Sequence, residues 1–219
     1  MTFKFPKGFY WGAATSAHQI EGGLKNNWSE WEFAHSKIAS EKNLKKRPSY
    51  LINEENYKDS CKPSNYISGL ACDSFHKYKE DVKVIKKLGL NCYRFSVDWS
   101  RIEPQKGKFS VDGIQYYKNL VKELKQNDIE PFITCWHWPI PLWLKEEGGL
   151  LSKNIVEYFE NYVRFLVENL GNEVNFWMTI NEPLSTASSY LFGWWPPQKK
   201  NLFKFYKVTF VNLVKMHKV

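Results

Sequence analysis

The sequence has little of what stabilises small secreted domains or spans membranes. Its 219 residues include only four cysteines, scattered at Cys61, Cys72, Cys92 and Cys135, and no two form a C-x-x-C pair. This spacing excludes a disulfide framework and the common cysteine motifs for zinc and redox chemistry. No stretch approaches the roughly 18 uninterrupted apolar residues of a membrane span, and the first residues lack the apolar core of a signal peptide. We therefore expect a cytoplasmic protein with reduced thiols and no membrane partner.

Acidic residues are also the minority charge, with 23 Asp and Glu against 31 Lys and Arg, a net charge of +8. The excess favours acidic partners, but the basic residues are spread along the chain, so we expect no nucleic-acid partner. The hydrophobic fraction of 43% supplies a core and excludes intrinsic disorder. Aromatic residues make up 17%, more than packing requires, and rings stack on flat ligands such as sugars or bases.

Hydrophobic periodicity alternates between short strands and amphipathic helices. Apolar, β-branched and aromatic runs predict strands at 9–14, 91–97, 129–136 and 176–181. Helical spacing of apolar residues predicts three helices between them: one from an Asp73 N-cap to Gly89, one through 114–124, and one from a Ser152 N-cap to Gly171. Strands that alternate with helices of this length predict βα units around a parallel sheet.

Two segments depart from this rhythm. Residues 25–72 are polar and include the Lys-rich run 41–47, so we expect a surface excursion at the rim and not a separate domain. A last helix is predicted to begin near Asn201 and continues to the end of the sequence without a capping Gly or Asn. We interpret this ending as a pattern that stops part-way.

Polar and aromatic side chains follow three of the predicted strands. Gln19 comes after the first strand, His137 and Trp138 after the third, and Asn181 and Glu182 after the fourth. Active sites of parallel βα folds lie at the carboxyl ends of the strands. Each residue also has a plain structural interpretation: a helix-start carboxylate, a core histidine, or a loop amide. Their convergence on one edge favours a surface that binds a polyol.

Arg94 lies in the middle of the second predicted strand, among apolar residues. An unpaired cation is costly there, so Arg94 needs a carboxylate partner. That partner is either part of a structural ion pair or is itself catalytic.

Four motifs in order along the chain resemble glycoside hydrolase family 1, the β-glucosidase and β-galactosidase family. They cover most of the sequence and are specific in combination. They are Phe9-Tyr-Trp-Gly-Ala-Ala-Thr-Ser-Ala-His-Gln-Ile-Glu-Gly22, Tyr93-Arg-Phe-Ser-Val-Asp-Trp-Ser-Arg-Ile-Glu-Pro104, Trp136-His-Trp-Pro-Ile-Pro-Leu-Trp143 and Thr179-Ile-Asn-Glu-Pro183.

The resemblance implies an α/β fold of the (β/α)8 TIM-barrel type, of which this chain supplies about the first four βα units. Residues 1–219 are then the N-terminal half of one glycosidase domain, with the rim insertion at about 25–72. The implied activity is that of a retaining β-glycosidase, which hydrolyses terminal β-O-glycosidic bonds of a β-glycoside or oligosaccharide by double displacement. No metal and no organic cofactor is implied.

The resemblance also assigns roles by motif. Glu182 matches the general acid/base, and Asn181 matches the residue that binds the sugar 2-hydroxyl. Arg94 matches the residue that orients the nucleophilic carboxylate and keeps it ionised. Gln19 and His137 match ligands of the glycone hydroxyls, and Trp138 matches a wall of the sugar site.

The nucleophile of this family is a Glu in a Glu-Asn-Gly motif, which this sequence lacks; Glu168-Asn-Leu lies on the third helix and is no substitute. Because retaining hydrolysis needs two carboxylates about 5 Å apart, we expect the chain alone to be inactive. Its expected partners are a missing C-terminal half-barrel or a second copy of itself. The alternative is a noncatalytic carbohydrate-binding half-barrel or truncated pseudoenzyme.

Overall fold

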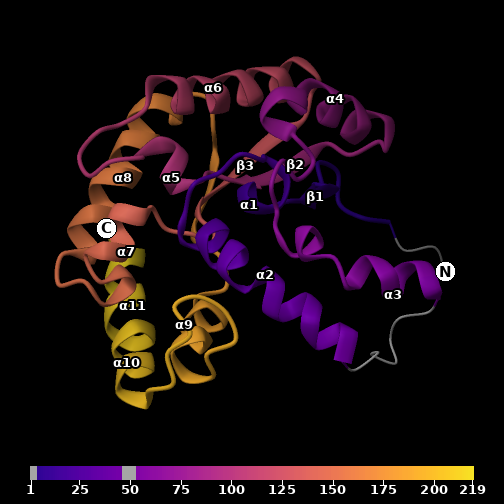
Figure 1. Ribbon diagram of the computed structural model, residues 1–219. Coiled ribbons are helices and arrows are strands. Elements are labelled where there is room, and N and C mark those ends of the chain that lie inside the picture. The colour runs from indigo at the N-terminus through magenta and orange to yellow at the C-terminus, as the bar shows by residue number, and fades with distance from the viewer. Residues whose placement is uncertain (1–3, 46–52) are drawn as a thin grey trace.

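The computed structural model describes residues 4–45 and 53–219 (Figure 1). Within these ranges the strands are β1 (Gly12–Ala14), β2 (Cys92–Ser96), β3 (Glu130–Trp136) and β4 (Phe176–Ile180). All neighbouring pairs are parallel, and the sheet order β1-β2-β3-β4 follows the sequence. The predicted parallel sheet of βα units is therefore confirmed.

The first strand pair requires a glycine. Gly12 lies opposite Cys92, and a Cβ at this position would stand only 2.7 Å from the Cys92 carbonyl oxygen. Any other residue would push β1 away from β2, so Gly12 fixes the close approach of the two strands.

The three predicted crossover helices are α4 (Ser74–Lys87), α6 (Val111–Gln126) and α8 (Ile155–Leu170). They run round the outside of the sheet in Figure 1. Their apolar stripes form one core with the buried strand residues. Fully buried members of that core include Val82, Leu124, Ile133, Phe159 and Leu166.

The structure places two helix starts differently from the sequence pattern. Asp73 holds the N-cap position of α4 but has a left-handed backbone (φ 57°) and does not cap with its side chain; its carboxylate instead bonds His76 Nδ1 at 2.6 Å. The helix predicted from Ser152 begins at Ile155 with Asn154 as N-cap, because Ser152 closes the 3₁₀ turn η2 (Gly149–Leu151).

The polar segment 25–72 is largely helical where it is described. It contains α2 (Asn27–Lys45), α3 (Glu54–Ser60) and the 3₁₀ turn η1 (Pro63–Tyr66). The Asn27 amide donates to Ile140 O at 3.1 Å, so α2 starts beside the loop that follows β3. Part of the Lys-rich run, Lys46 and Arg47, lies outside the described residues.

A short helix follows each strand at its carboxyl end. These helices are α1 (Ala17–Ile20), α5 (Trp99–Ile102), α7 (Leu142–Glu146) and α9 (Pro183–Leu191). The last part of the chain comprises α10 (Leu202–Tyr206), the π-helical segment η3 (Lys207–Asn212) and α11 (Leu213–His217). Asn201 caps α10 by accepting from the Lys204 amide at 3.0 Å, so this helix begins near Asn201, where the sequence predicts the last helix to start.

The edges of the sheet are less covered than its centre. All three residues of β1 are exposed and all five of β4 are half-buried, whereas β2 and β3 are mostly buried.

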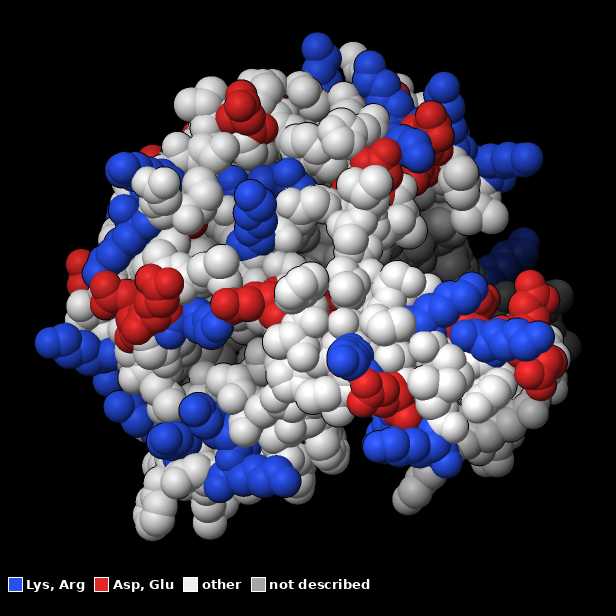
Figure 2. All heavy atoms as spheres, viewed as in Figure 1, with Lys and Arg blue, Asp and Glu red and all other residues white. Residues whose placement is uncertain are grey.

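On the face in Figure 2, Lys and Arg are distributed round the molecule and interleaved with Asp and Glu. No helix of the described ranges is long and apolar enough to cross a bilayer.

Candidate active site

The turn from β4 into α9 presents Glu182. This residue is the N-cap of α9 and has a left-handed backbone (φ 42°, ψ 65°), while Pro183 opens the helix. Its side chain is exposed and forms no hydrogen bond or ion pair with any other residue in the described ranges. The carboxylate therefore lies at the carboxyl edge of the sheet without a partner among the described residues.

Asn181 is held on three sides beside Glu182. Its backbone amide donates to Trp136 O at 3.0 Å, and its backbone oxygen accepts from Trp138 Nε1 at 3.1 Å. Its side-chain Oδ1 accepts from Arg94 Nη2 at 2.7 Å. The side chain is buried, and its Nδ2 donor is left without a protein acceptor among the described residues. Asn181 is thus fixed in orientation with one donor available to a ligand.

Arg94 has neutral partners where a carboxylate was expected. Besides Asn181, it donates from Nε to Thr134 Oγ1 at 2.8 Å. No carboxylate of the described residues lies within ion-pair distance of its guanidinium, so the interpretation of Arg94 as a structural ion pair is wrong for this part of the chain. A hydroxyl oxygen and an amide oxygen accept from two of its N–H donors, and neither partner compensates the positive charge.

The charges of Arg94 and Glu182 shift the pKa of His137 in opposite directions. Burial lowers its pKa to about 4, and the nearby Arg94 charge acts in the same direction while Glu182 opposes both. The imidazole is therefore neutral at pH 7. Its Nδ1 atom is buried without a hydrogen-bond partner in the described structure.

Trp138 and Gln19 complete the set of predicted site residues. Trp138 has a left-handed backbone (φ 85°), and its indole stacks on Trp28 and Trp195. Gln19 lies on α1 beyond β1, with an exposed side chain whose Oε1 accepts from Ser16 Oγ at 2.8 Å. Hydrogen bonds join Arg94 to Asn181 and Asn181 to Trp138, whereas Gln19 comes from the opposite edge of the sheet and forms no hydrogen bond with them in the described structure.

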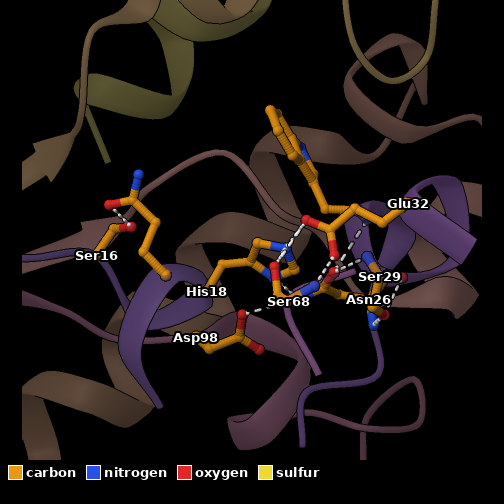
Figure 3. A network of polar contacts seen from close by, with 9 residues as sticks. Ser16, His18, Asn26, Ser29, Glu32, Ser68 and Asp98 are labelled. Carbon is orange, nitrogen blue, oxygen red and sulfur yellow. Dashed lines mark hydrogen bonds and ion pairs between the residues drawn. The ribbon is translucent and has the colours of Figure 1, made fainter. Parts of the chain in front are cut away.

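A buried polar network that sequence reasoning did not assign lies beside the site (Figure 3). His18 Nε2 bonds Glu32 Oε1 at 2.9 Å, and Asn26 Nδ2 lies 3.2 Å from both His18 Nδ1 and Asp98 Oδ2. Burial raises the pKa of Glu32, but hydrogen bonds from His18 and Ser68 outweigh it and lower the pKa overall. These contacts fasten α1, α2 and the carboxyl end of β2 to one another.

A second buried group surrounds Glu21. Arg101 Nε donates to Glu21 Oε2 at 2.8 Å, and Tyr117 OH donates to Glu21 Oε1 at 2.6 Å. Arg101 also donates to the Gly22 carbonyl at 3.0 Å. Burial raises the pKa of Glu21 to about 7, although the Arg101 charge acts to lower it.

Across the described ranges, no three His, Cys, Asp or Glu side chains gather as a metal-binding group.

Comparison with known proteins agrees with the motifs at the strand ends. The model of the family described as glycosyl hydrolase family 1 matches residues 1–218. The chain belongs to this family. Among curated relatives, Myrosinase 1 of Brevicoryne brassicae is 40% identical over 192 residues, which is 87% of this chain and 38% of the relative. The 1,4-beta-D-glucan glucohydrolase of Thermotoga neapolitana is 33% identical over 216 residues, 98% of this chain and 46% of the relative.

Solved structures give the same result for the fold of this family 1 chain. Aphid myrosinase superposes with a TM-score of 0.80 at 33% identity, over 97% of this chain and 43% of that one. The β-glucosidase from Thermotoga maritima in complex with deoxynojirimycin superposes with a TM-score of 0.76 at 33% identity, over 98% and 45%. The described fold is therefore part of a (β/α)8 barrel, and the chain spans less than half the length of these relatives.

Proposed function

We propose that this family 1 chain carries the acid/base half of a retaining β-glycosidase site. The observation that carries the proposal is the free, exposed Glu182 carboxylate beside Asn181, whose orientation Arg94 fixes. A general acid must reach the glycosidic oxygen of a ligand, so its side chain cannot be engaged by the protein. An amide in a fixed orientation beside it suits a sugar hydroxyl.

In the proposed reaction Glu182 protonates the leaving oxygen of a β-O-glycoside and later deprotonates the attacking water. Asn181 Nδ2 donates to the 2-hydroxyl, while Gln19 and neutral His137 bind other hydroxyls and Trp138 forms one wall. Arg94, whose charge lacks a described carboxylate, orients the nucleophile. We propose that this nucleophile comes from polypeptide outside the 219 residues, which would then be the N-terminal half of a single domain.

Hydrolysis of 2,4-dinitrophenyl β-D-glucoside tests the proposal. This chain is assayed alone and coexpressed with a C-terminal half-barrel of the kind that the proposal requires. We expect turnover only for the combination. In the combination, Glu182→Gln is expected to slow steady-state turnover about 10²- to 10⁴-fold. Azide should restore the rate and give a β-glucosyl azide, because an anionic nucleophile needs no general base.

A matched control is Glu168→Gln, which alters an exposed carboxylate on α8 away from the site and should leave the rate unchanged. Loss of activity without azide rescue would contradict the acid/base role.

The lack of a described carboxylate near Arg94 favours one alternative, a noncatalytic carbohydrate-binding half-barrel. That alternative predicts glucose binding that depends on Asn181, with no turnover in any combination.

A further inference from the structure

The last part of the chain carries most of the net positive charge. Residues 183–219 contain six lysines and no Asp, Glu or Arg. They therefore supply six of the eight net positive charges, and the 182 residues before them are nearly balanced at +2. In Figure 2, blue side chains gather with no red ones among them at the lower left, where Figure 1 places α10. A surface of one sign attracts ions of the opposite sign over a distance.

One exposed side of the helix in this segment is apolar. The elements α10, η3 and α11 follow one another without a break from Leu202 to His217, and we call them together the terminal helix. Its exposed large apolar side chains recur three and four residues apart, the spacing of one helix face. They are Phe203 (86% exposed), Tyr206 (60%), Phe210 (57%) and Val214 (43%). The ring centroids of Tyr206 and Phe210 are 5.2 Å apart, so these rings share one side of the helix.

Lysines flank this apolar side, and they also recur three or four residues apart along part of the helix. All are exposed, and none forms an ion pair with a described residue. They are Lys204, Lys207, Lys215 and Lys218, with Lys199 and Lys200 just before the helix.

The remaining side of the terminal helix is fixed to the domain. Val208, Leu213 and Met216 are buried and belong to the core, and Asn212 Nδ2 donates to Leu150 O at 2.5 Å. The helix therefore keeps one orientation, in which the apolar rings and the lysines face outward together.

An exposed apolar side between lysines is the pattern of a helix that lies in the interface of an anionic bilayer. The rings enter the boundary between headgroups and acyl chains, and the ammonium groups approach the headgroup phosphates. Other occupants fit less well. A second copy of this surface would bring six more lysines, and like charges oppose association. Arginine is the preferred residue for nucleic-acid recognition, and this segment has none.

We propose that the terminal helix binds the surface of a bilayer that contains anionic phospholipids. Phe203, Tyr206 and Phe210 insert, and the flanking lysines supply the attraction. The expectation of no membrane partner rested on the lack of a spanning segment, which a helix that lies on the surface does not need. This binding is additional to the proposed glycosidase function and does not depend on it.

Cosedimentation of the 219-residue chain with lipid vesicles tests this surface. The vesicles contain phosphatidylcholine with an equal amount of phosphatidylserine, or phosphatidylcholine alone. We expect saturable binding to the first kind, weakened by added salt, and at least about tenfold weaker binding to the second. Lys204→Gln with Lys207→Gln should weaken binding about 25-fold, at about fivefold per lysine. Phe203→Ser with Phe210→Ser should weaken it at least about tenfold, because less apolar area is inserted.

A charge-matched control comes from α4. Lys83→Gln with Lys87→Gln removes the same charge from exposed positions, and α4 lies across the molecule from α10 in Figure 1. This variant should bind within about twofold of the parent, because salt screens charges far from the contact. The residues substituted in the terminal helix are exposed as well, so every variant should keep the circular dichroism spectrum of the parent.

The proposal is overturned if vesicles with phosphatidylserine do not sediment the chain, if the lipid composition makes no difference, or if the α4 variant binds as weakly as the lysine variant of the terminal helix. Three further results would assign the surface to another occupant and overturn it equally. They are binding of duplex DNA in place of vesicles, self-association that Phe203→Ser with Phe210→Ser abolishes, and loss of vesicle binding when the C-terminal half-barrel is coexpressed.

Discussion

Two arginines seven residues apart have opposite surroundings. Arg101 donates to the buried Glu21 carboxylate, which also accepts from Tyr117, so its charge is compensated within the fold. Among the described residues, the side chain of Arg94 donates only to the neutral oxygens of Thr134 and Asn181. The Arg101 arrangement is a structural ion pair whose partners both lie within the described residues. The second leaves a positive charge for an anion that the described residues do not supply, and it lies where the proposed chemistry takes place.

Arg101→Met should give the largest loss of stability. The substitution preserves much of the side-chain volume but leaves Glu21, which is 2% exposed, as a buried carboxylate without its counterion. Breaking a buried pair in this way costs about 3 to 5 kcal/mol. Urea denaturation at pH 8, above the Glu21 pKa of about 7 in the parent chain, measures the free energy of unfolding. A loss below about 1 kcal/mol would mean that Arg101 is not essential to the framework.

Arg94→Met should cost less, about 1 to 2 kcal/mol, because only hydrogen bonds to neutral partners are lost and no carboxylate is left behind. The same urea titration measures it. Equal losses for Arg94→Met and Arg101→Met would remove the contrast between the two arginines.

The pH dependence of stability should report His137. Its pKa is lowered to about 4 in the folded protein and is near 6.5 when unfolded, so the unfolded state binds more protons between these values. Stability should therefore fall as pH decreases from about 6.5 to 4. His137→Gln should reduce proton uptake on unfolding at pH 5 by about one proton. An unchanged pH profile would show that another group controls this window.

Thr186→Val should have the smallest effect, within about 0.5 kcal/mol. Its hydroxyl is buried without a partner, so its removal breaks no hydrogen bond, unlike either arginine substitution. Thermal unfolding of this variant measures the change. A loss above about 1 kcal/mol would indicate a hydrogen bond to the hydroxyl.

The sequence predicted the parts of the fold whose signal is local. Helices α4, α6 and α8 bury apolar stripes, and such stripes are visible as periodicity. Helix α2 was not predicted, because the residues it buries are the small polar Asn27, Ser36 and Ser40, which give no apolar pattern.

The site was predictable to a similar extent. The strand-end rule grouped Asn181 and Glu182 with His137 and Trp138, since it follows from the parallel topology. The neutral partners of Arg94 and the link from His18 to Glu32 and Ser68 could not be predicted. These contacts join residues 14 to 87 positions apart, and nothing in the spacing of the sequence encodes such pairs.

The backbone of Glu182 has an evolutionary consequence. Its left-handed φ of 42° suits glycine, and a residue with a Cβ pays about 1 to 2 kcal/mol for it. Glu182→Gly would thus gain stability while it deletes the carboxylate, so selection for a durable protein and selection for a working catalyst oppose each other here. If the proposed glycoside hydrolysis is not under selection, this position is expected to drift to glycine.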